Sequence, residues 1–181
     1  MKKLLLIIGM PGSGKDTQIE YMAKRRKLSV IRIGDLVREK ARTDQGISKD
    51  LEAGNLVDKG VVNALVADAI KSSVDGSYII SDGFPRDLPQ AQWLNEYLPN
   101  CNCELDKVLY IDIDDITALE RLQKRGRDDD DEATINHRLE VFHTQTDDVI
   151  DYYQKSGQLT KVDGRLDPDE VAEKIQKVLG W

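Results

Sequence analysis

The stretch from residue 4 to residue 18 constrains the fold more than any other part of the chain. It reads L-L-L-I-I-G-M-P-G-S-G-K-D-T-Q: a short apolar run, a glycine-rich loop and the start of a helical pattern. Glycines allow backbone N–H groups to converge on an anion, and a helix N-terminus adds its dipole. Lys15 supplies a mobile positive charge. This order predicts a phosphate-binding loop rather than an ordinary strand-to-helix turn with a surface lysine.

One position in this loop departs from the expected pattern. The form G-x-x-x-x-G-K-[ST] runs from Gly9 to Lys15, but Asp16 stands where a hydroxyl residue is expected, and Thr17 follows it. A carboxylate beside a phosphate is repulsive, so Mg²⁺ or Lys15 has to offset its charge. The candidate ligands of the phosphates are Gly12, Ser13, Gly14, Lys15, Asp16 and Thr17.

Composition limits the partners of this chain of 181 residues, which is of a length expected for one domain. Its formal net charge of −7 is a poor electrostatic match for nucleic acid polymers and anionic membranes. The only two cysteines, Cys101 and Cys103, are expected to be reduced thiols of a cytoplasmic protein. The first apolar run is too short for a signal peptide, and no run approaches transmembrane length. We therefore expect a cytoplasmic protein. A monomer is the expected form, although nothing in the composition determines the oligomeric state.

Alternating apolar and helical patterns predict an α/β fold. The expected strands are 4–8, 30–33, 78–80, 108–113 and 159–162, and the expected helices are 17–26, 36–41, 51–56, 57–74, 88–98, 116–124, 132–156 and 168–179. Such alternation predicts a five-stranded parallel sheet with helices on both faces, of the P-loop NTPase type. Residues 43–50 are expected to form a loop. The helical region of about 34–70 is longer than a simple crossover, which indicates an inserted subdomain.

Further motifs follow along nearly the whole chain. They are G-D-L-V-R at 34–38, A-G-N-L-V at 53–57, D-G-F-P-R at 82–86 with Gln90, and then Arg121, Arg125, Arg127 and Arg138. With these motifs the chain resembles the adenylate kinases and, more widely, the nucleoside monophosphate kinases. D-G-F-P-R is the most specific of them. The resemblance implies the reaction ATP + AMP ⇌ 2 ADP with Mg²⁺, and thus a phosphotransferase with both nucleotides as its partners.

The residues themselves support this chemistry. Asp82 ends a predicted strand at the carboxyl edge of the sheet, where ligands of α/β sheets bind. Its carboxylate can hold Mg²⁺ through water, although it can also cap the next helix. Arg38 and Arg86 each follow a strand end, so both can face one crevice, and two guanidinium forks suit a monophosphate. Arg121 and Arg125 share a helix face, which alone indicates only a charged surface stripe.

The resemblance also implies roles for individual residues. On the ATP side, Arg121 would pack on the adenine, the backbone near Leu166 would border it, and Arg125 would reach the phosphates. The residues implied in AMP binding are Ile33, Arg38, Asn55, Leu56, Val57, Gly83, Phe84, Pro85, Arg86, Gln90, Arg127 and Arg138. The residues implied in catalysis, which for phosphoryl transfer rests on positive charge and positioning, are Lys15, Arg86, Arg125, Arg127 and Arg138.

The expected lid, at about 125–131, is very short. Only Gly126 separates Arg125 from Arg127, where many of the similar kinases carry a longer loop and some a zinc-binding insert, so we expect no zinc. The acidic run at 128–131 has two readings. It is a solvated face, or, as the resemblance implies, Asp129 and Asp130 pair with other charges and hold the lid closed.

The residues that would contact the acceptor base match the adenylate kinases only in part. Gln90 stands four residues after Arg86, and an amide can both donate to and accept from adenine. Ile33, however, occupies a position where adenylate kinases usually have threonine. AMP is the expected acceptor, with a raised KM. A UMP/CMP kinase and a catalytically weak nucleotide sensor are the alternatives. A regulatory GTPase would need an N-K-x-D segment, and His137 and His143 belong to no hydrolase motif.

Overall fold

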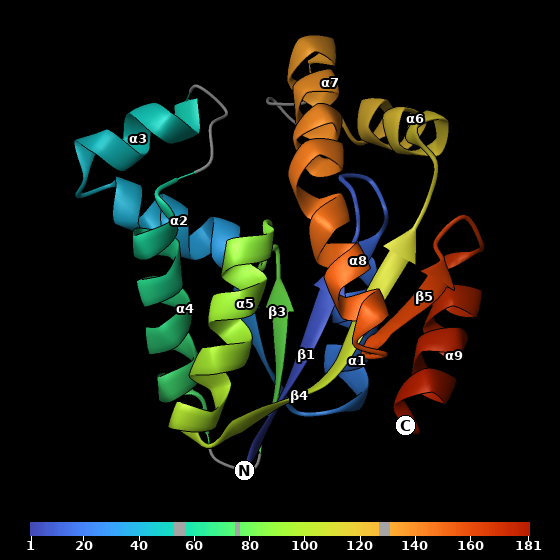
Figure 1. Ribbon diagram of the computed structural model, residues 1–181. Coiled ribbons are helices and arrows are strands. Elements are labelled where there is room, and N and C mark those ends of the chain that lie inside the picture. The colour runs from blue at the N-terminus through green and yellow to red at the C-terminus, as the bar shows by residue number, and fades with distance from the viewer. Residues whose placement is uncertain (53–56, 75–76, 127–130) are drawn as a thin grey trace.

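A five-stranded sheet forms the centre of the computed structural model, which describes residues 1–52, 57–74, 77–126 and 131–181. The strands are β1 (Lys2–Ile8), β2 (Leu28–Arg32), β3 (Tyr78–Asp82), β4 (Cys103–Asp112) and β5 (Leu159–Asp163), in the order β2-β3-β1-β4-β5. All neighbouring strands are parallel, so all five end at one edge of the sheet (Figure 1). The predicted parallel sheet is confirmed.

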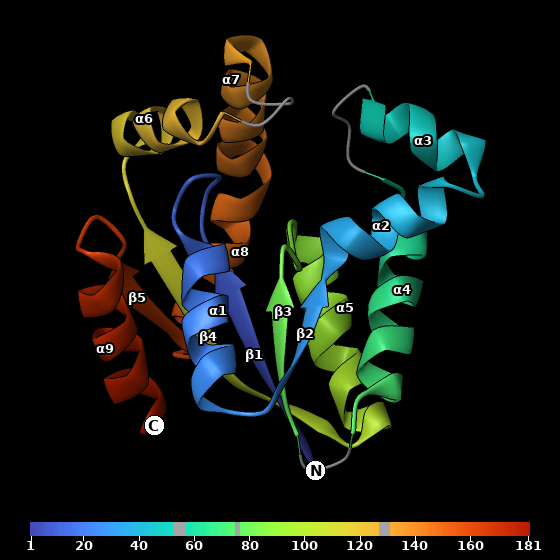
Figure 2. The same cartoon turned by 180° about the vertical axis from the view of Figure 1, so that it is seen from behind.

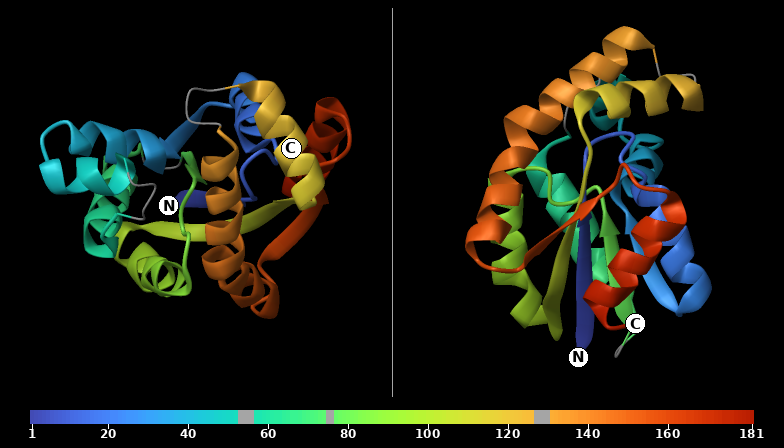
Figure 3. Two further views of the ribbon diagram at one scale, coloured as in Figure 1. Left: turned by 90° about the horizontal axis from the view of Figure 1, so that it is seen from above. Right: turned by 90° about the vertical axis from the view of Figure 1, so that its right-hand side faces the viewer.

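Helices cover both faces of this sheet. They are α1 (Lys15–Arg25), α2 (Ile33–Ala41), α3 (Gln45–Glu52), α4 (Lys59–Ser72), α5 (Leu88–Tyr97), α6 (Asp115–Arg125), α7 (Glu132–Val141), α8 (Asp147–Lys155) and α9 (Pro168–Leu179). Helices α1 and α9 lie on one face, as the view from behind shows (Figure 2), and α4, α5 and α8 lie on the other. The elements α6, α7, α2 and α3 gather at the carboxyl edge, above the sheet (Figure 3).

The central strand β1 is buried on both faces. Leu4 and Leu6 belong to the cluster under α4, α5 and α8, whereas Leu5 and Ile7 belong to the cluster under α1 and α9. Successive side chains of a strand point to opposite faces, so an uninterrupted apolar run is what a doubly covered strand requires. The sheet is thus held between two apolar layers, and its carboxyl edge carries the connecting loops.

The structure corrects the sequence reading between β2 and α4. Ile33, predicted to end a strand, is the first residue of α2. Residues 43–50 are predicted to be a loop because of Gly46, but 45–50 belong to α3. The carboxylate of Asp44 accepts hydrogen bonds from the backbone N–H groups of Gly46 (3.0 Å) and Ile47 (3.3 Å), and Ile47 is buried. Capping and burial therefore outweigh the low helix propensity of glycine.

Two further elements differ from their predicted form. The long helix expected at 132–156 is interrupted by a π-helical turn at Phe142–Thr146, which separates α7 from α8. Strand β4 begins at Cys103 rather than at residue 108, because its polar first half still pairs with β1. The helical piece expected at 51–56 ends with α3 at Glu52, and residues 53–56 lie outside the described residues.

Both cysteines are free thiols in the structure. Burial raises the pKa of the Cys103 thiol to about 11, so it is protonated at neutral pH. His143 is exposed at the π turn, with Nε2 2.8 Å from the Asp115 carboxylate at the start of α6, so it links these two elements. In the part of the chain that the structure describes, no helix has the length and apolar character to span a membrane.

Candidate active site

The loop between β1 and α1 has the geometry of an anion-binding loop. Gly12 (φ 83°) and Gly14 (φ 90°) adopt left-handed conformations, and Gly14 is the N-cap residue of α1. A Cβ atom on Gly12 would lie 2.9 Å from the carbonyl oxygen of Ala118, so the loop packs closely against α6. Glycine is favoured at both positions by conformation, and at Gly12 also by lack of space. The predicted order of strand, glycine-rich loop and helix is present.

Lys15 folds back over this loop. Its Nζ donates hydrogen bonds to the carbonyl oxygens of Gly9 (2.6 Å) and Met10 (3.1 Å) and lies 3.4 Å from the hydroxyl of Ser13. The side chain is partly buried, and desolvation lowers the pKa of its ammonium group. The positive charge is therefore held inside the loop by neutral carbonyls, which phosphate oxygens can replace as stronger partners.

Two carboxylates, those of Asp82 and Asp16, act on the charge of Lys15. Asp82 ends β3 directly beside Ile7 of β1, and Asp16 is the second residue of α1. Burial raises the pKa of Asp82, the charge of Lys15 opposes this shift and the charge of Asp16 adds to it. Asp16 is exposed and lies in the first turn of α1, where the helix dipole favours a negative charge. The dipole and Lys15 thus make a carboxylate tolerable beside this loop.

The alternative role of Asp82 as a helix cap is wrong. The N-cap residue of α5 is Asp87, whose Oδ1 accepts a hydrogen bond from the backbone N–H of Gln90 at 3.0 Å. Asp82 instead sits at the carboxyl edge of the sheet, next to the phosphate loop.

The backbone of Arg86 is held on both sides. Its N–H donates to Oε1 of Gln90 at 2.8 Å, and its carbonyl oxygen accepts a hydrogen bond from the hydroxyl of Thr146 at 3.0 Å. The guanidinium Nε donates to the carbonyl oxygen of Gly83, which adopts a left-handed conformation with φ 81°. The D-G-F-P-R segment is therefore a tight turn that presents one arginine in a defined place.

Positive charges converge on Arg86. Although its side chain reaches solvent, partial withdrawal from water lowers the pKa of its guanidinium group, and the charges of Arg138 and Arg38 add to this effect. Asp82 acts in the opposite direction. Arg38 comes from α2 and also pairs with Asp35, while Arg138 comes from α7. The charges of two arginines from other segments thus act on Arg86 at the carboxyl edge.

Helix α6 contributes two more of the predicted arginines. Nη1 of Arg121 donates to the carbonyl oxygen of Gly164 at 2.9 Å, which joins α6 to the loop after β5. Leu166, in the same loop, packs against the cluster under α1 and α9. Arg125, at the end of α6, lies close enough to Lys15 to lower its pKa. Arg121 is therefore tied to the loop after β5, whereas Arg125 is exposed at the end of α6.

Some predicted ligands have side chains in the core. Phe84 is 1% exposed and packs edge-on against Trp93, and Ile33 and Val57 are also buried. Any contact of Phe84 with a nucleotide thus falls to its backbone. Gln90 is 4% exposed and its amide oxygen already accepts one hydrogen bond from Arg86, which leaves its NH₂ group and one further acceptor position for a base.

Several predictions at the lid and the acceptor side lie outside the described residues. These residues are Asn55, Leu56, Arg127, Asp129 and Asp130. Asp131, the last carboxylate of the acidic run, is the N-cap residue of α7 and accepts a hydrogen bond from the backbone N–H of Thr134 at 3.0 Å. That carboxylate has a structural role as a helix cap, which neither reading of the run anticipated.

Comparison with known proteins identifies the family. The family model for adenylate kinase matches residues 7–158. The chain belongs to the adenylate kinase family. Proteins named adenylate kinase are similar over nearly their whole length: one from Pseudarthrobacter chlorophenolicus is 39% identical, with 97% of this chain and 95% of the relative covered. One from Synechococcus sp. (strain RCC307) is 38% identical, with 99% and 100% covered. One from Prochlorococcus marinus (strain MIT 9211) is 36% identical, with 99% and 98% covered.

These comparisons confirm the expected family and class of enzyme, an adenylate kinase acting as a phosphotransferase. Adenylate kinases in general use ATP with Mg²⁺. Within the described residues, no group of three or more His, Cys, Asp or Glu side chains is arranged to hold a metal ion directly. Asp82 with Asp16 nearby still fits an ion held through water, because a cation would relieve the repulsion between the two carboxylates.

Two residues of this adenylate kinase site carried no recognisable signal in the sequence. Thr146 contacts a residue 60 positions away, and Nζ of Lys59, at the start of α4, lies 3.1 Å from Oδ2 of Asp87. Both contacts hold the segment around Arg86 from other elements. Threonine in a helix and lysine at a helix start are common, so only the tertiary structure reveals these roles.

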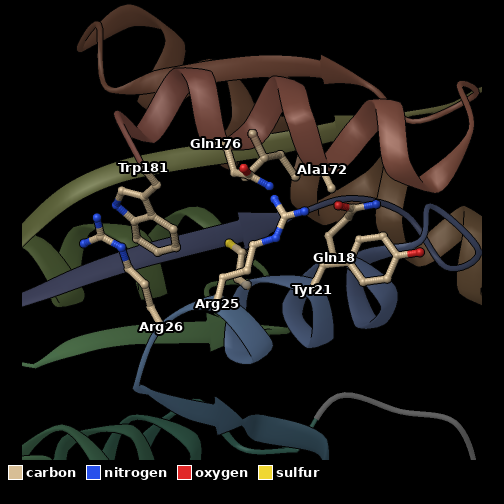
Figure 4. A pocket seen from close by; sticks show the side chains of 9 residues that line it. Gln18, Tyr21, Arg25, Arg26, Ala172, Gln176 and Trp181 are labelled. Atoms are coloured by element: carbon tan, nitrogen blue, oxygen red, sulfur yellow. The ribbon is translucent and has the colours of Figure 1, made fainter.

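A groove elsewhere on the protein is separate from this site. It lies between α1 and α9, has a volume of about 120 Å³, and is lined by none of the predicted site residues that the structure describes (Figure 4). The guanidinium of Arg26 stacks over the ring of Trp181 at 4.7 Å. Nε2 of Gln18 donates to the carbonyl oxygen of Pro168 at 2.9 Å. Gln18, the last residue of the phosphate-loop motif, therefore ties α1 to α9.

Replacing Asp16 by asparagine tests how this carboxylate acts on the donor site. We expect Asp16→Asn to tighten ATP binding roughly three- to tenfold at low ionic strength, and less at high salt, because a repulsive charge is removed. Titration of ATP into both proteins at two salt concentrations measures the effect. Glu20→Gln, which removes an exposed charge further along α1, is the matched control. An equal change in both variants would mean that Asp16 acts only through net charge.

Proposed function

We propose that this protein transfers the γ-phosphoryl group of ATP reversibly to AMP, giving two molecules of ADP. One observation carries the proposal: the charges of Lys15, from the phosphate loop, and of Arg86, from the D-G-F-P-R turn, both act on Asp82, which ends β3 beside Ile7 at one edge of the sheet. Positive charge from two segments near one carboxylate suits two phosphate chains placed end to end. The family of the chain supports the same reaction.

The donor side would bind ATP through the glycine-rich loop. The backbone N–H groups at 12–17 and the dipole of α1 attract the phosphates. Lys15 would exchange the carbonyl oxygens of Gly9 and Met10 for phosphate oxygens. Arg121, fixed by its hydrogen bond to Gly164, and the loop around Leu166 would border the adenine.

The acceptor side would bind AMP through its phosphate. Arg86 and Arg38 offer guanidinium forks that match phosphate oxygens in pairs. Ile33 and Val57 supply apolar surface, and Gln90 has its NH₂ group for the base. We propose that Asn55, Leu56 and Arg127 complete this side, that α2, α3 and α4 form the acceptor-binding subdomain, and that 125–131 acts as a short lid.

Catalysis would rest on positioning and charge. The phosphate monoester of AMP has a second pKa of about 6, so at neutral pH it attacks as a dianion and needs no general base. The charge that spreads over the transferred group in the transition state is met by Lys15, Arg86 and, from α6 and α7, Arg125 and Arg138. These side chains orient the two phosphates in line and replace the water around them.

Magnesium has a place in this arrangement. Asp82 would hold it through water, with Asp16 beside it, and the ion would neutralise oxygens of the phosphate chain. The raised pKa of Asp82, caused by burial and by Asp16, supports a site that a cation stabilises. We also propose that the enzyme works as a monomer and in the cytoplasm, a location that its acidic charge and its two free thiols support.

A UMP/CMP kinase is a second candidate because the base-reading groups are few. Ile33 is a buried apolar side chain where a hydroxyl is usual, and the amide oxygen of Gln90 already accepts one hydrogen bond from Arg86. Both features reduce the hydrogen bonds available to adenine. They weaken the preference for AMP without assigning another base.

The first test of the proposal removes the positive charges of Lys15 and Arg86 in turn. Lys15→Ala and Arg86→Ala should each lower kcat at least about a hundredfold, because groups that stabilise transition-state charge contribute that much. Both variants should keep the wild-type circular dichroism spectrum. Lys24→Ala, on the same helix as Lys15 but away from the loop, is the control and should be fully active. Near-wild-type turnover in either site variant would contradict the assignment.

The second test compares acceptors. With ATP as the donor and AMP, UMP or CMP as the acceptor, a coupled assay for ADP should show the highest kcat/KM with AMP. Ile33→Thr should lower the KM for AMP roughly fivefold if the new hydroxyl forms one hydrogen bond. Gln90→Glu keeps the oxygen that binds the N–H of Arg86 but removes the NH₂ group, so it should raise that KM. Faster phosphorylation of UMP or CMP would favour the second candidate.

A further inference from the structure

Two threonines of the π turn use their hydroxyl groups differently. Thr144 donates to the carbonyl oxygen of Glu140 at 2.8 Å, one turn earlier in its own helix. This is the usual behaviour of threonine inside a helix. Thr146, at the end of the same turn and only 7% exposed, donates instead to the carbonyl oxygen of Arg86, a residue 60 positions away. The π turn thus carries a hydroxyl that leaves its helix and holds another segment.

The segment that Thr146 holds bears the central arginine of the acceptor side. With the N–H of Arg86 bonded to Gln90 and its carbonyl oxygen bonded to Thr146, both peptide groups that flank its Cα are fixed. The guanidinium group is influenced by Arg138, which stands on α7, just before the π turn. The continuous helical segment of α7 and the π turn therefore carries both Arg138 and the Thr146 hydroxyl that binds the backbone of Arg86 (Figure 1).

We propose that Thr146 is a positioning residue for the acceptor phosphate. Its hydroxyl fixes the backbone of Arg86 relative to the π turn and α7. It thereby sets the distance between the Arg86 and Arg138 guanidinium groups. A guanidinium fork binds a phosphate through paired hydrogen bonds, which depend on its orientation. π-Helical turns within α-helices occur frequently at functional sites. This inference rests on the proposed function, because it assigns the acceptor phosphate to Arg86.

A purely structural role makes a different prediction. A buried carbonyl oxygen that loses its donor costs stability wherever it lies. Such a loss would lower the melting temperature without affecting the AMP and ATP constants differently. A positioning role would affect the AMP constants more than the ATP constants, because Arg86 belongs to the acceptor side and the phosphate loop is held independently by α1 and α6.

The test compares Thr146→Ser with Thr146→Ala. Both side chains are smaller than threonine, so neither can clash, and they differ from each other only by the hydroxyl. We expect Thr146→Ser to stay within twofold of wild type and Thr146→Ala to raise the KM for AMP roughly fivefold, the effect of about one hydrogen bond. The KM for ATP should change less than twofold in both. Thr144→Ala, which removes the neighbouring hydroxyl, should leave both constants unchanged.

Calorimetric titration of AMP into each variant and a thermal melt complete the test. Weaker AMP binding in Thr146→Ala than in Thr146→Ser, with equal ATP constants, supports the proposal. Equal AMP constants in the two variants, or equal changes for AMP and ATP, overturn it even if the melting temperature falls. If the wild-type protein phosphorylates no nucleoside monophosphate, the proposed function fails instead, so the two failures are distinguishable.

Discussion

The parallel pairing of β1 with β3 is the constraint on which the site depends. The pairing places Ile7 beside Asp82, so the strand before the phosphate loop and the strand before the D-G-F-P-R turn end together. A slip of one residue would turn every side chain of β1 to the opposite face. Leu4 and Leu6 would then exchange places with Leu5 and Ile7 between the two apolar layers, so every side-chain contact of this strand would change.

The consequence of this register is a concentration of charge at one edge. Burial lowers the pKa of Lys15, and withdrawal from water together with Arg38 and Arg138 lowers that of Arg86. Like charges held together in partly desolvated surroundings are unfavourable without a counter-ion, and shifts of this kind concentrate at functional sites. Phosphate groups of nucleotides would add negative charge at this edge. The same arrangement therefore favours the binding of phosphate groups there.

Local patterns were sufficient to predict the sheet and the phosphate loop, because apolar runs and glycine spacing determine both within a few residues. They misjudged α3, where the Asp44 cap and the buried Ile47 outweigh Gly46. The π turn and the bond from Thr146 to Arg86 were beyond sequence reasoning, since they depend on packing between segments 60 residues apart. Gln90 was recognised, but not that its amide oxygen holds the backbone of Arg86.

A crystal structure with AMP and a non-hydrolysable ATP analogue bound together tests the central claim most directly. The analogue's phosphates should lie in the loop at 12–17, with Nζ of Lys15 moved from the Gly9 carbonyl oxygen to phosphate oxygens. The AMP phosphate should lie on Arg86 and Arg38, next to the terminal phosphate of the analogue. Nucleotide bound elsewhere, such as in the groove between α1 and α9, or Lys15 still bonded to the loop carbonyls, would contradict this claim.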